Sequence, residues 1–261
     1  MAERTTDDRL LEGKVALITG SASGQGRAAA LRFARHGAAI AIVDIADDGS
    51  AETARQVEAL GGEATVIHAD VSVQADVEAM VTATVERWGR LDVLYNNAAV
   101  QMSGRLVECS EADWDRTIAT NLDAVFWACR AALPAMLAGE GGSIINTASV
   151  LGLIGSEGYV AYGAAKAGLV ALTRQIAVEY GPSVRANVIA PGSIDTPRFQ
   201  KVAAEMDDPE GFVAGLAKTI PLHRLGTAED VASVALFLAS DLSAYVSGAV
   251  IPADGGLAVF R

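Results

Sequence analysis

The stretch of this 261-residue sequence that decides the fold is Val15-Ala-Leu-Ile-Thr19-Gly20-Ser-Ala-Ser-Gly24-Gln-Gly26. A short apolar run enters a turn with three glycines, and residues 26–36 then carry small and apolar side chains at helical spacing. Glycines permit a tight turn and a close approach of the backbone to a ligand. The first N–H groups of the following helix attract a pyrophosphate. A glycine-rich turn alone is a weak signal, but at the first strand–helix junction it predicts a dinucleotide-binding turn.

The same alternation continues along the chain. Further apolar runs of strand length occur at 40–43, 64–67, 91–94, 143–146, 186–189 and 248–251. Apolar residues at steps of three and four predict helices between them, including a long one with a single apolar face from Trp114 to Leu133. Continuous apolar strands that alternate with helices are typical of a parallel sheet covered on both faces. The prediction for residues 1–261 is one α/β domain: a doubly wound, Rossmann-type parallel sheet of about seven strands.

One connection, at residues 192–224, is longer and more polar than the others. We expect short helices there that form a substrate-binding flap beside the ligand crevice; a plain surface insertion is the alternative. Its side chains Phe199, Met206, Phe212 and Leu216, together with the run 150–154, would line an apolar pocket. Such a pocket suits an uncharged, mostly apolar alcohol or ketone, including cyclic ones, although any of these residues could be ordinary core.

The overall charge limits the classes of partner. With 20 Lys and Arg against 32 Asp and Glu, the formal net charge is −12, which disfavours binding to nucleic acid or to an anionic membrane. No apolar run is long enough to span a membrane, and the charged start of the chain has no secretory signal, so we expect a cytoplasmic protein. Two cysteines suggest no disulfide framework, and the three scattered histidines predict no metal site.

Acidic residues after the second and third strands bear on the cofactor. Asp44 follows Gly26 by 18 residues, where a carboxylate can accept both ribose hydroxyls of an adenosine and repel a 2′-phosphate. No Arg or Lys occupies 45–48, so the sequence favours NAD over NADP. A helix cap is the alternative role for Asp44. Asp70 and Val71 are expected at the adenine edge, with a plain strand-end turn as the alternative.

Four residues form a candidate catalytic group. Tyr162 and Lys166 are four residues apart, which places phenol and ammonium on one face of a helix. A nearby cation favours the phenolate, so Tyr162 could act as an acid or base near neutral pH, although the spacing alone also fits a surface pair. Ser149 ends a predicted strand 13 residues upstream, where sheet enzymes place their chemistry. Asn121 lies among apolar residues within the long helix, where a buried amide needs partners.

These motifs together resemble the short-chain dehydrogenase/reductase family over about residues 13–256. The resemblance rests on the TGxxxGxG turn, Asp70, Asn96-Asn97-Ala98, Asn121, Ser149, Tyr162, Lys166, Pro191-Gly192 with Thr196, and Asp254-Gly255-Gly256. Three positions depart from the family pattern: Gln25 replaces an aliphatic residue, and Ala99 and Ala124 replace glycines.

The resemblance implies a role for each matching residue. Tyr162 would be the acid/base, Ser149 would position the reacting oxygen, Lys166 would lower the pKa of Tyr162 and hold the nicotinamide ribose, and Asn121 would anchor a proton-relaying water. The residues expected to hold NAD are Gly20, Ser23, Gly24, Gln25, Gly26, Asp44, Ile45, Asp70, Val71, Asn97, Ala98, Ala99, Thr147, Tyr162, Lys166, Pro191, Gly192, Ile194 and Thr196.

The expected function is therefore NAD-dependent interconversion of a secondary alcohol and a ketone. One alternative is a 3-oxoacyl-carrier-protein reductase, which would want NADP and a basic patch for its acidic carrier; Asp44 and the negative charge argue against it. Another is a catalytically idle NAD sensor, which should have lost part of the catalytic group. The family and an apolar surplus on the helices at 114–133 and 169–176 also predict a homotetramer.

Overall fold

The computed structural model describes residues 9–260. Residues 1–8, which belong to the stretch used to argue against a secretory signal, lie outside the described part of the chain. Within residues 9–260, no helix combines the length and the apolarity needed to cross a bilayer.

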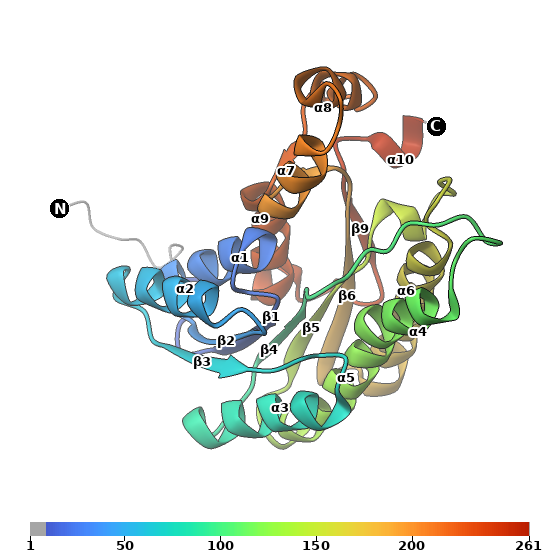
Figure 1. Cartoon of the computed structure of the whole chain (residues 1–261). Coiled ribbons are helices and arrows are strands. Elements are labelled where there is room, and N and C mark those ends of the chain that lie inside the picture. Colours follow the sequence, from blue (N-terminus) through green and yellow to red (C-terminus); the bar gives the residue numbers. More distant parts are fainter. Residues whose placement is uncertain (1–8, 261) are drawn as a thin grey trace.

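Seven parallel strands form one sheet in the order β3-β2-β1-β4-β5-β6-β9 (Figure 1). The strands are β1 (Val15–Thr19), β2 (Ala39–Asp44), β3 (Ala64–His68), β4 (Val93–Asn96), β5 (Gly142–Thr147), β6 (Val184–Pro191) and β9 (Val250–Ala253). The predicted doubly wound parallel sheet is therefore confirmed. The direction of winding reverses between β1 and β4, and in such sheets the ligand crevice lies at the carboxyl ends of the strands beside that reversal.

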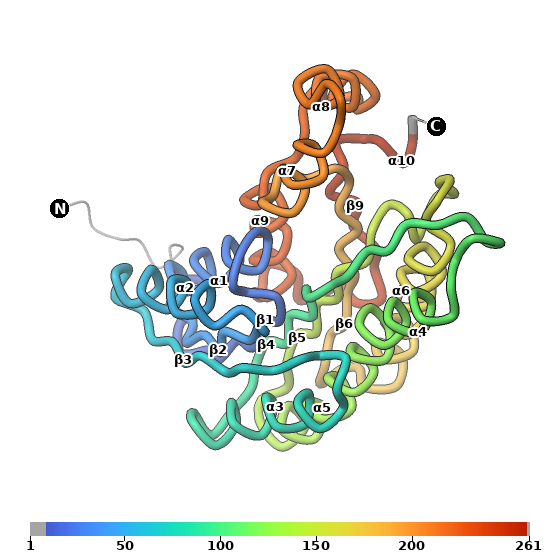
Figure 2. The backbone as a smooth tube through the Cα atoms, in the orientation of Figure 1, coloured from blue at the N-terminus to red at the C-terminus, as the bar shows by residue number. Residues whose placement is uncertain are grey.

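Helices cover both faces of the sheet because each carries one buried apolar stripe (Figure 2). One face holds α1 (Gly24–Arg35), α2 (Asp47–Ala59) and α9 (Ala228–Ala239), whose buried side chains include Phe33, Val57 and Val231. The other face holds α3 (Gln74–Trp88), α5 (Ala124–Ala138) and α6 (Val160–Tyr180). A short helix, α10 (Leu257–Phe260), ends the described chain. The two apolar layers fix the sheet, and the strand ends are left free to present polar groups.

The predicted long helix from Trp114 to Leu133 is wrong as a single element. The structure has α4 (Glu111–Ile118), then one π-helical turn (Ala119–Asp123), then α5. In that turn the N–H of Ala124 donates to the carbonyl of Ala119, five residues back. The extra residue rotates α5 relative to α4, so that Cys129 and Leu133 are buried while Trp114 and Phe126 are about half exposed.

Residues 192–224 leave the sheet and form a separate small unit. It contains the two-residue strand β7 (Ile194–Asp195), which pairs with β8 (Gly226–Thr227), and the helices α7 (Pro197–Ala204) and α8 (Pro209–Lys218). Figure 1 shows α7 and α8 standing apart from the two helical layers. They contact each other through stacked Phe199 and Phe212 rings, 6.1 Å between centroids, and α8 has no buried residue.

Candidate active site

The glycine turn between β1 and α1 is shaped by close backbone contacts. Gly20 and Gly24 have φ angles of +68° and +53°, which side chains with a Cβ rarely adopt. A Cβ on Gly26 would lie 2.1 Å from the carbonyl oxygen of Gly20, so only glycine fits there. The turn therefore brings bare backbone to the crevice at the end of β1.

The start of α1 has hydrogen-bonding capacity to spare. Its N-cap, Ser23, is exposed and makes no side-chain cap bond, so the first N–H groups of the helix keep no side-chain partner. The buried Oε1 atom of Gln25 accepts no hydrogen bond. Free N–H groups and a positive dipole end suit a phosphate, and the orphaned amide oxygen can accept one more donor. The free N–H groups fit the pyrophosphate end of a dinucleotide, whereas the Gln25 amide oxygen is itself an acceptor and cannot bond to a phosphate.

Asp44 ends β2 and faces the same turn. Its carboxylate accepts hydrogen bonds from the N–H of Ala22, at 3.0 Å, and from the N–H of Ala46, at 3.1 Å. The N-cap of α2 is Ala46, so Asp44 does not fill the helix-cap role that was its alternative. These bonds fix a carboxylate beside the glycine turn, while the next residue, Ile45, is mostly exposed.

Thr19, which the sequence argument did not place in the site, links β1 to the chain after β4. Its hydroxyl accepts from the N–H groups of Asn97, at 3.0 Å, and Ala98, at 3.1 Å. The Asn97 side chain donates to the carbonyls of Thr19 and Gly20. Thus Asn97 supports the turn with its amide. Its expected contact with NAD stays a prediction.

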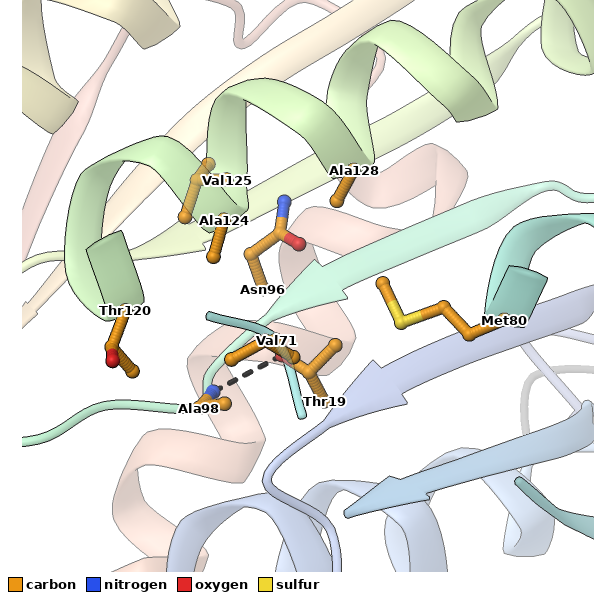
Figure 3. Close-up of a pocket in the computed structure, with 9 residues that line it drawn as sticks. All are labelled: Thr19, Val71, Met80, Asn96, Ala98, Thr120, Ala124, Val125 and Ala128. Atoms are coloured by element: carbon orange, nitrogen blue, oxygen red, sulfur yellow. Dashed lines mark hydrogen bonds between the residues drawn. The ribbon is translucent and has the colours of Figure 1, made fainter. Parts of the chain in front are cut away.

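A narrow crevice lies behind Ala98 (Figure 3). Its volume is about 10 Å³, room for about one water molecule. It is lined by Thr19, Val71, Met80, Asn96, Ala98, Thr120, Ala124, Val125 and Ala128. It is too small for a nucleotide, so a dinucleotide would lie outside it, along the strand ends. Ala124, one of the departures from the family pattern, lines this gap rather than an open pocket.

The remaining expected cofactor residues are spread along the strand ends. The exposed Asp70 carboxylate accepts from the N–H and hydroxyl of Ser72, as a strand-end turn would have it. Pro191 ends β6, and the next residue, Gly192, donates its N–H to the carbonyl of Ala253. Ile194 is buried, Ala99 is partly buried, and Thr196 is the N-cap of α7, its hydroxyl accepting from Phe199. A Cβ on Gly24 would lie 3.5 Å from Thr196, which brings β7 and α7 next to the glycine turn.

Asn121 lies in the π-helical turn and is fully buried. Its side-chain N–H₂ group donates to the carbonyls of Val100 and Thr117, each at 2.9 Å. Its Oδ1 atom is buried and has no hydrogen-bond partner. The Asn121 Nδ2 atom therefore has the partners that burial requires, whereas the Oδ1 atom remains free to accept a hydrogen bond. It ties the π turn to the loop that follows β4.

Ser149, Tyr162 and Lys166 come together at the carboxyl end of β5. The Lys166 ammonium donates to the carbonyl of Thr147 at 2.8 Å and lies 5.5 Å from the centroid of the Tyr162 ring. The Ser149 hydroxyl interacts with the Tyr162 phenol and also accepts from Leu151 N–H at 3.2 Å. All three side chains are buried. The three polar groups therefore share one small, largely dry volume.

Burial and one distant cation set the ionisation of this group. Burial raises the pKa of Tyr162, while the charge of Arg198 and the hydroxyl of Ser149 act in the opposite direction. Burial, together with the smaller effect of the charge of Arg198, lowers the pKa of Lys166 to about 7. Without a cofactor, the cation that acts on the Tyr162 phenol is therefore Arg198. The expected effect of Lys166 on that pKa stays a prediction.

Arg198 and its partner Gln101 were missed by the sequence argument. Arg198 is the second residue of α7, and its guanidinium donates to the side-chain carbonyl of Gln101, 97 residues earlier. Gln101 directly follows Val100, whose carbonyl holds Asn121. The only signal in the sequence was a cation among the apolar residues of the flap.

Comparison with known proteins matches this arrangement to one family. The family model adh_short_C2, described as enoyl-(acyl carrier protein) reductase, matches residues 20–258. The chain belongs to the short-chain dehydrogenase/reductase family. Among the relatives of this short-chain dehydrogenase/reductase is the 3-oxoacyl-carrier-protein reductase of Thermotoga maritima, 41% identical over 250 residues, or 95% of this chain and 99% of that protein.

A second relative is levodione reductase from Leifsonia aquatica, 40% identical over 249 residues, or 93% of either chain. A crystal structure of levodione reductase superposes with a TM-score of 0.92 at 38% identity and covers 95% of this chain and 99% of the other. This short-chain dehydrogenase/reductase is thus an oxidoreductase that acts on CH–OH groups, and its family uses NAD or NADP.

No metal site competes with this assignment in the described part of the short-chain dehydrogenase/reductase: residues 9–260 hold no group of three His, Cys, Asp or Glu side chains that could bind an ion. His68 instead hydrogen-bonds to Asp47 at the surface. Of the two thiols, Cys109 is partly exposed and Cys129 is buried, and burial raises the pKa of Cys129 to about 12. A thiol with that pKa is not a ready nucleophile.

Proposed function

We propose that the enzyme interconverts a secondary alcohol and a ketone with NAD, and that Tyr162 is its acid/base. The observation that carries the proposal is the convergence of Ser149, Tyr162 and Lys166 at the end of β5. A catalytically idle NAD-binding protein is the contrasting hypothesis. It gives no reason for three polar side chains to be buried together, since such burial is costly unless it serves a purpose.

In the oxidation direction, Ser149 would hold the substrate hydroxyl, and the Tyr162 phenolate would take its proton. The nicotinamide of the bound cofactor supplies the hydride acceptor. Lys166 would stabilise the phenolate and hold the nicotinamide ribose, and Asn121, through its free Oδ1 atom, would anchor the water that passes the proton outward. In the reduction direction the Tyr162 phenol would protonate the carbonyl oxygen. The buried site excludes bulk water from these transfers.

The preference for NAD over NADP rests on Asp44. The carboxylate is fixed by two backbone N–H groups beside the glycine turn and keeps lone pairs for ribose hydroxyls. A 2′-phosphate would meet this negative charge, and residues 45–48 supply no cation. The Asp44 carboxylate at the end of β2 therefore supports a preference for NAD over NADP.

The body of the substrate is proposed to be mostly apolar, including cyclic alcohols and ketones. Val150 is buried and Leu151 partly buried next to Ser149. Phe199 and Phe212 stack on each other and so form the apolar underside of a flap rather than two independent pocket walls. The exposed positive charge of Arg198 is an argument against a substrate with no charge at all.

A second candidate is reduction of a 3-oxoacyl thioester on a carrier protein. The observation that favours it is the 41% identity to the reductase from Thermotoga maritima. Such a carrier is acidic, and this chain has a formal charge of −12, which disfavours their association. Turnover of acetoacetyl-carrier protein with NADPH, faster than any simple ketone with NADH, would make this candidate the better one.

A homotetramer in the cytoplasm completes the proposal. Four large apolar side chains on α4, α5 and α6 are between 40% and 80% exposed: Trp114, Phe126, Leu137 and Val178. Apolar surface of this kind supports an isologous contact between copies. Light scattering at micromolar concentration should give about four times 26.9 kDa, and a mass of 26.9 kDa would refute the tetramer.

The test of the catalytic proposal is Tyr162→Phe, which keeps the ring and removes the proton. Turnover in a scan of secondary alcohols with NAD, followed at the nicotinamide absorbance, should fall by about 10²–10⁴. Binding of NADH should change little. Tyr180→Phe makes the same change at the other end of α6 and should keep full turnover. Equal activity in Tyr162→Phe and wild type would end the assignment, and no turnover of any alcohol by the wild type would favour the idle protein.

A further inference from the structure

Arg198 and Gln101 connect the flap to the loop that holds Asn121. Arg198 belongs to the flap helix α7, and Gln101 belongs to the chain that follows β4. Their side chains are hydrogen-bonded, and the residue before Gln101 holds Asn121 through its carbonyl. The pair therefore links the flap to a loop that also contacts a residue of the candidate catalytic group.

The guanidinium of Arg198 has most of its binding capacity unused. An arginine carries five N–H donors in a planar fork that matches a carboxylate. In the described part of the chain, Arg198 forms no ion pair, whereas six other arginines do: Arg9, Arg55, Arg87, Arg90, Arg105 and Arg224. Its one recorded partner is the neutral amide of Gln101. The Gln101 side-chain N–H₂ group remains able to donate to an incoming acceptor.

The charge of Arg198 acts electrostatically on two residues of the catalytic group. This positive charge acts to lower the pKa of both Tyr162 and Lys166. An exposed cation close enough to the catalytic group to act on its charges is suited to bind the negative end of a substrate.

The geometry points to a carboxylate-binding subsite formed by Arg198 and Gln101, so that the alcohol or ketone on which this enzyme acts carries a carboxylate. This inference rests on the proposed function and replaces only its expectation of an uncharged substrate. The guanidinium binds the carboxylate as a fork, Gln101 donates one further hydrogen bond, and the apolar residues behind Ser149 hold the body of the hydroxy acid. Binding of the acid would also draw α7 toward the loop after β4.

The experiment compares acids with amides of nearly the same shape. The probes are 3-hydroxycyclohexanecarboxylate and its carboxamide, and 3-hydroxybutanoate and its amide, each oxidised with NAD. The variants are Arg198→Met, which keeps an unbranched apolar stem without the charge, and Arg198→Lys, which keeps the charge. Lys201→Met is the matched control, because it removes one exposed positive charge from the same helix.

Wild type should prefer each acid over its amide by about tenfold or more in kcat/KM, since a hydrogen-bonded ion pair discriminates to that extent. Arg198→Met should lower kcat/KM for the acids by about 10–100-fold, mainly through KM, and change the amides by no more than a few fold. Arg198→Lys should restore part of the loss. Lys201→Met should resemble wild type with all four compounds.

Two outcomes would overturn the inference. If Arg198→Met lowers acids and amides equally, Arg198 acts on Tyr162 rather than on the substrate. If Arg198→Met weakens NADH binding, followed by quenching of protein fluorescence, the cation serves the cofactor.

Calorimetry separates this inference from the proposed function. Cyclohexanecarboxylate is titrated into wild type and Arg198→Met, with and without NADH, and needs no turnover. Binding by wild type that Arg198→Met loses would support the subsite even if no alcohol is oxidised. Absence of binding by wild type would overturn the subsite even if simple alcohols are good substrates.

Discussion

The glycine turn and the flap lie next to each other at Gly24 and Thr196, yet they are built in opposite ways. The turn, with α1 behind it, is held by buried apolar side chains and by backbone contacts that exclude a Cβ. The flap helices α7 and α8 are held by one aromatic pair and a few polar contacts; α7 has one buried residue, Ala203, and α8 has none that is fully buried. The glycine turn, proposed to bind the cofactor, is therefore fixed before a ligand arrives, whereas α7 and α8, proposed to border the substrate, are free to adapt.

The largest expected difference between the two regions is the loss of stability when a phenylalanine in each is truncated. Phe33→Ala in α1 removes a fully buried side chain and should lower the free energy of unfolding by about 3–5 kcal/mol. Phe212→Ala in α8 removes a half-buried ring from a stacked pair and should cost no more than about 1.5 kcal/mol.

Denaturant unfolding measures both variants. Hydrogen exchange should meanwhile become faster at 197–218 in Phe212→Ala and stay unchanged at β1. Equal losses of stability in the two variants would mean that the flap is part of the rigid core.

Cofactor choice should respond only to the cofactor side. Two unit charges about 4 Å apart at an effective dielectric of 20 repel by roughly 4 kcal/mol, and salt and water reduce the resulting preference to about tens to hundreds of fold. Asp44→Ala combined with Ile45→Arg should therefore shift the NAD/NADP ratio of kcat/KM by that factor toward NADP. Asp48→Ala removes an exposed acid nearby and should leave the ratio unchanged. A wild type that uses both cofactors equally would remove Asp44 from its proposed role.

A smaller contrast comes from adding one methyl group to a glycine in each region. Gly26→Ala places a Cβ against Gly20 and should destabilise the protein by about 1–3 kcal/mol while weakening NADH binding. Gly215→Ala meets nothing within 4 Å in the middle of α8 and should stabilise that helix by up to about 1 kcal/mol. Thermal unfolding with and without NADH distinguishes the two. A tolerated Gly26→Ala would show that the turn can yield.

The smallest effect links the two regions electrostatically. Because the charge of Arg198 lowers the pKa of Tyr162, Arg198→Met should raise that pKa. Alcohol oxidation needs the deprotonated phenol, so its rate increases as pH rises through this pKa, and the midpoint should move to higher pH in the variant. The pH profile of kcat/KM for a neutral alcohol measures it. A downward shift, or none, would mean that the flap carries its charge away from Tyr162 in solution.

The sequence predicted the strands of the sheet better than the details of the flap, and the reasons are physical. Apolar strands such as β1, and motifs such as Tyr162 with Lys166, consist of residues that are close together in the sequence. Hydrophobic periodicity and residue spacing therefore reveal them. The two-residue strands β7 and β8 are too short to show any period. Gln101 and Arg198 are 97 residues apart, and only the folded chain brings them together.

The π-helical turn has a consequence for length changes in the chain. An α-helix advances about 100° per residue, so deleting one residue from Ala119–Asp123 would let α4 and α5 fuse into one regular helix and turn one half against the other by that angle. Helix content, measured by circular dichroism, would hardly change, while Asn121 would leave its place below Val100. One residue of the π-helical turn thus sets the rotation of α5 relative to α4. An insertion or deletion there would leave the circular dichroism spectrum almost unchanged and would strongly lower the catalytic activity.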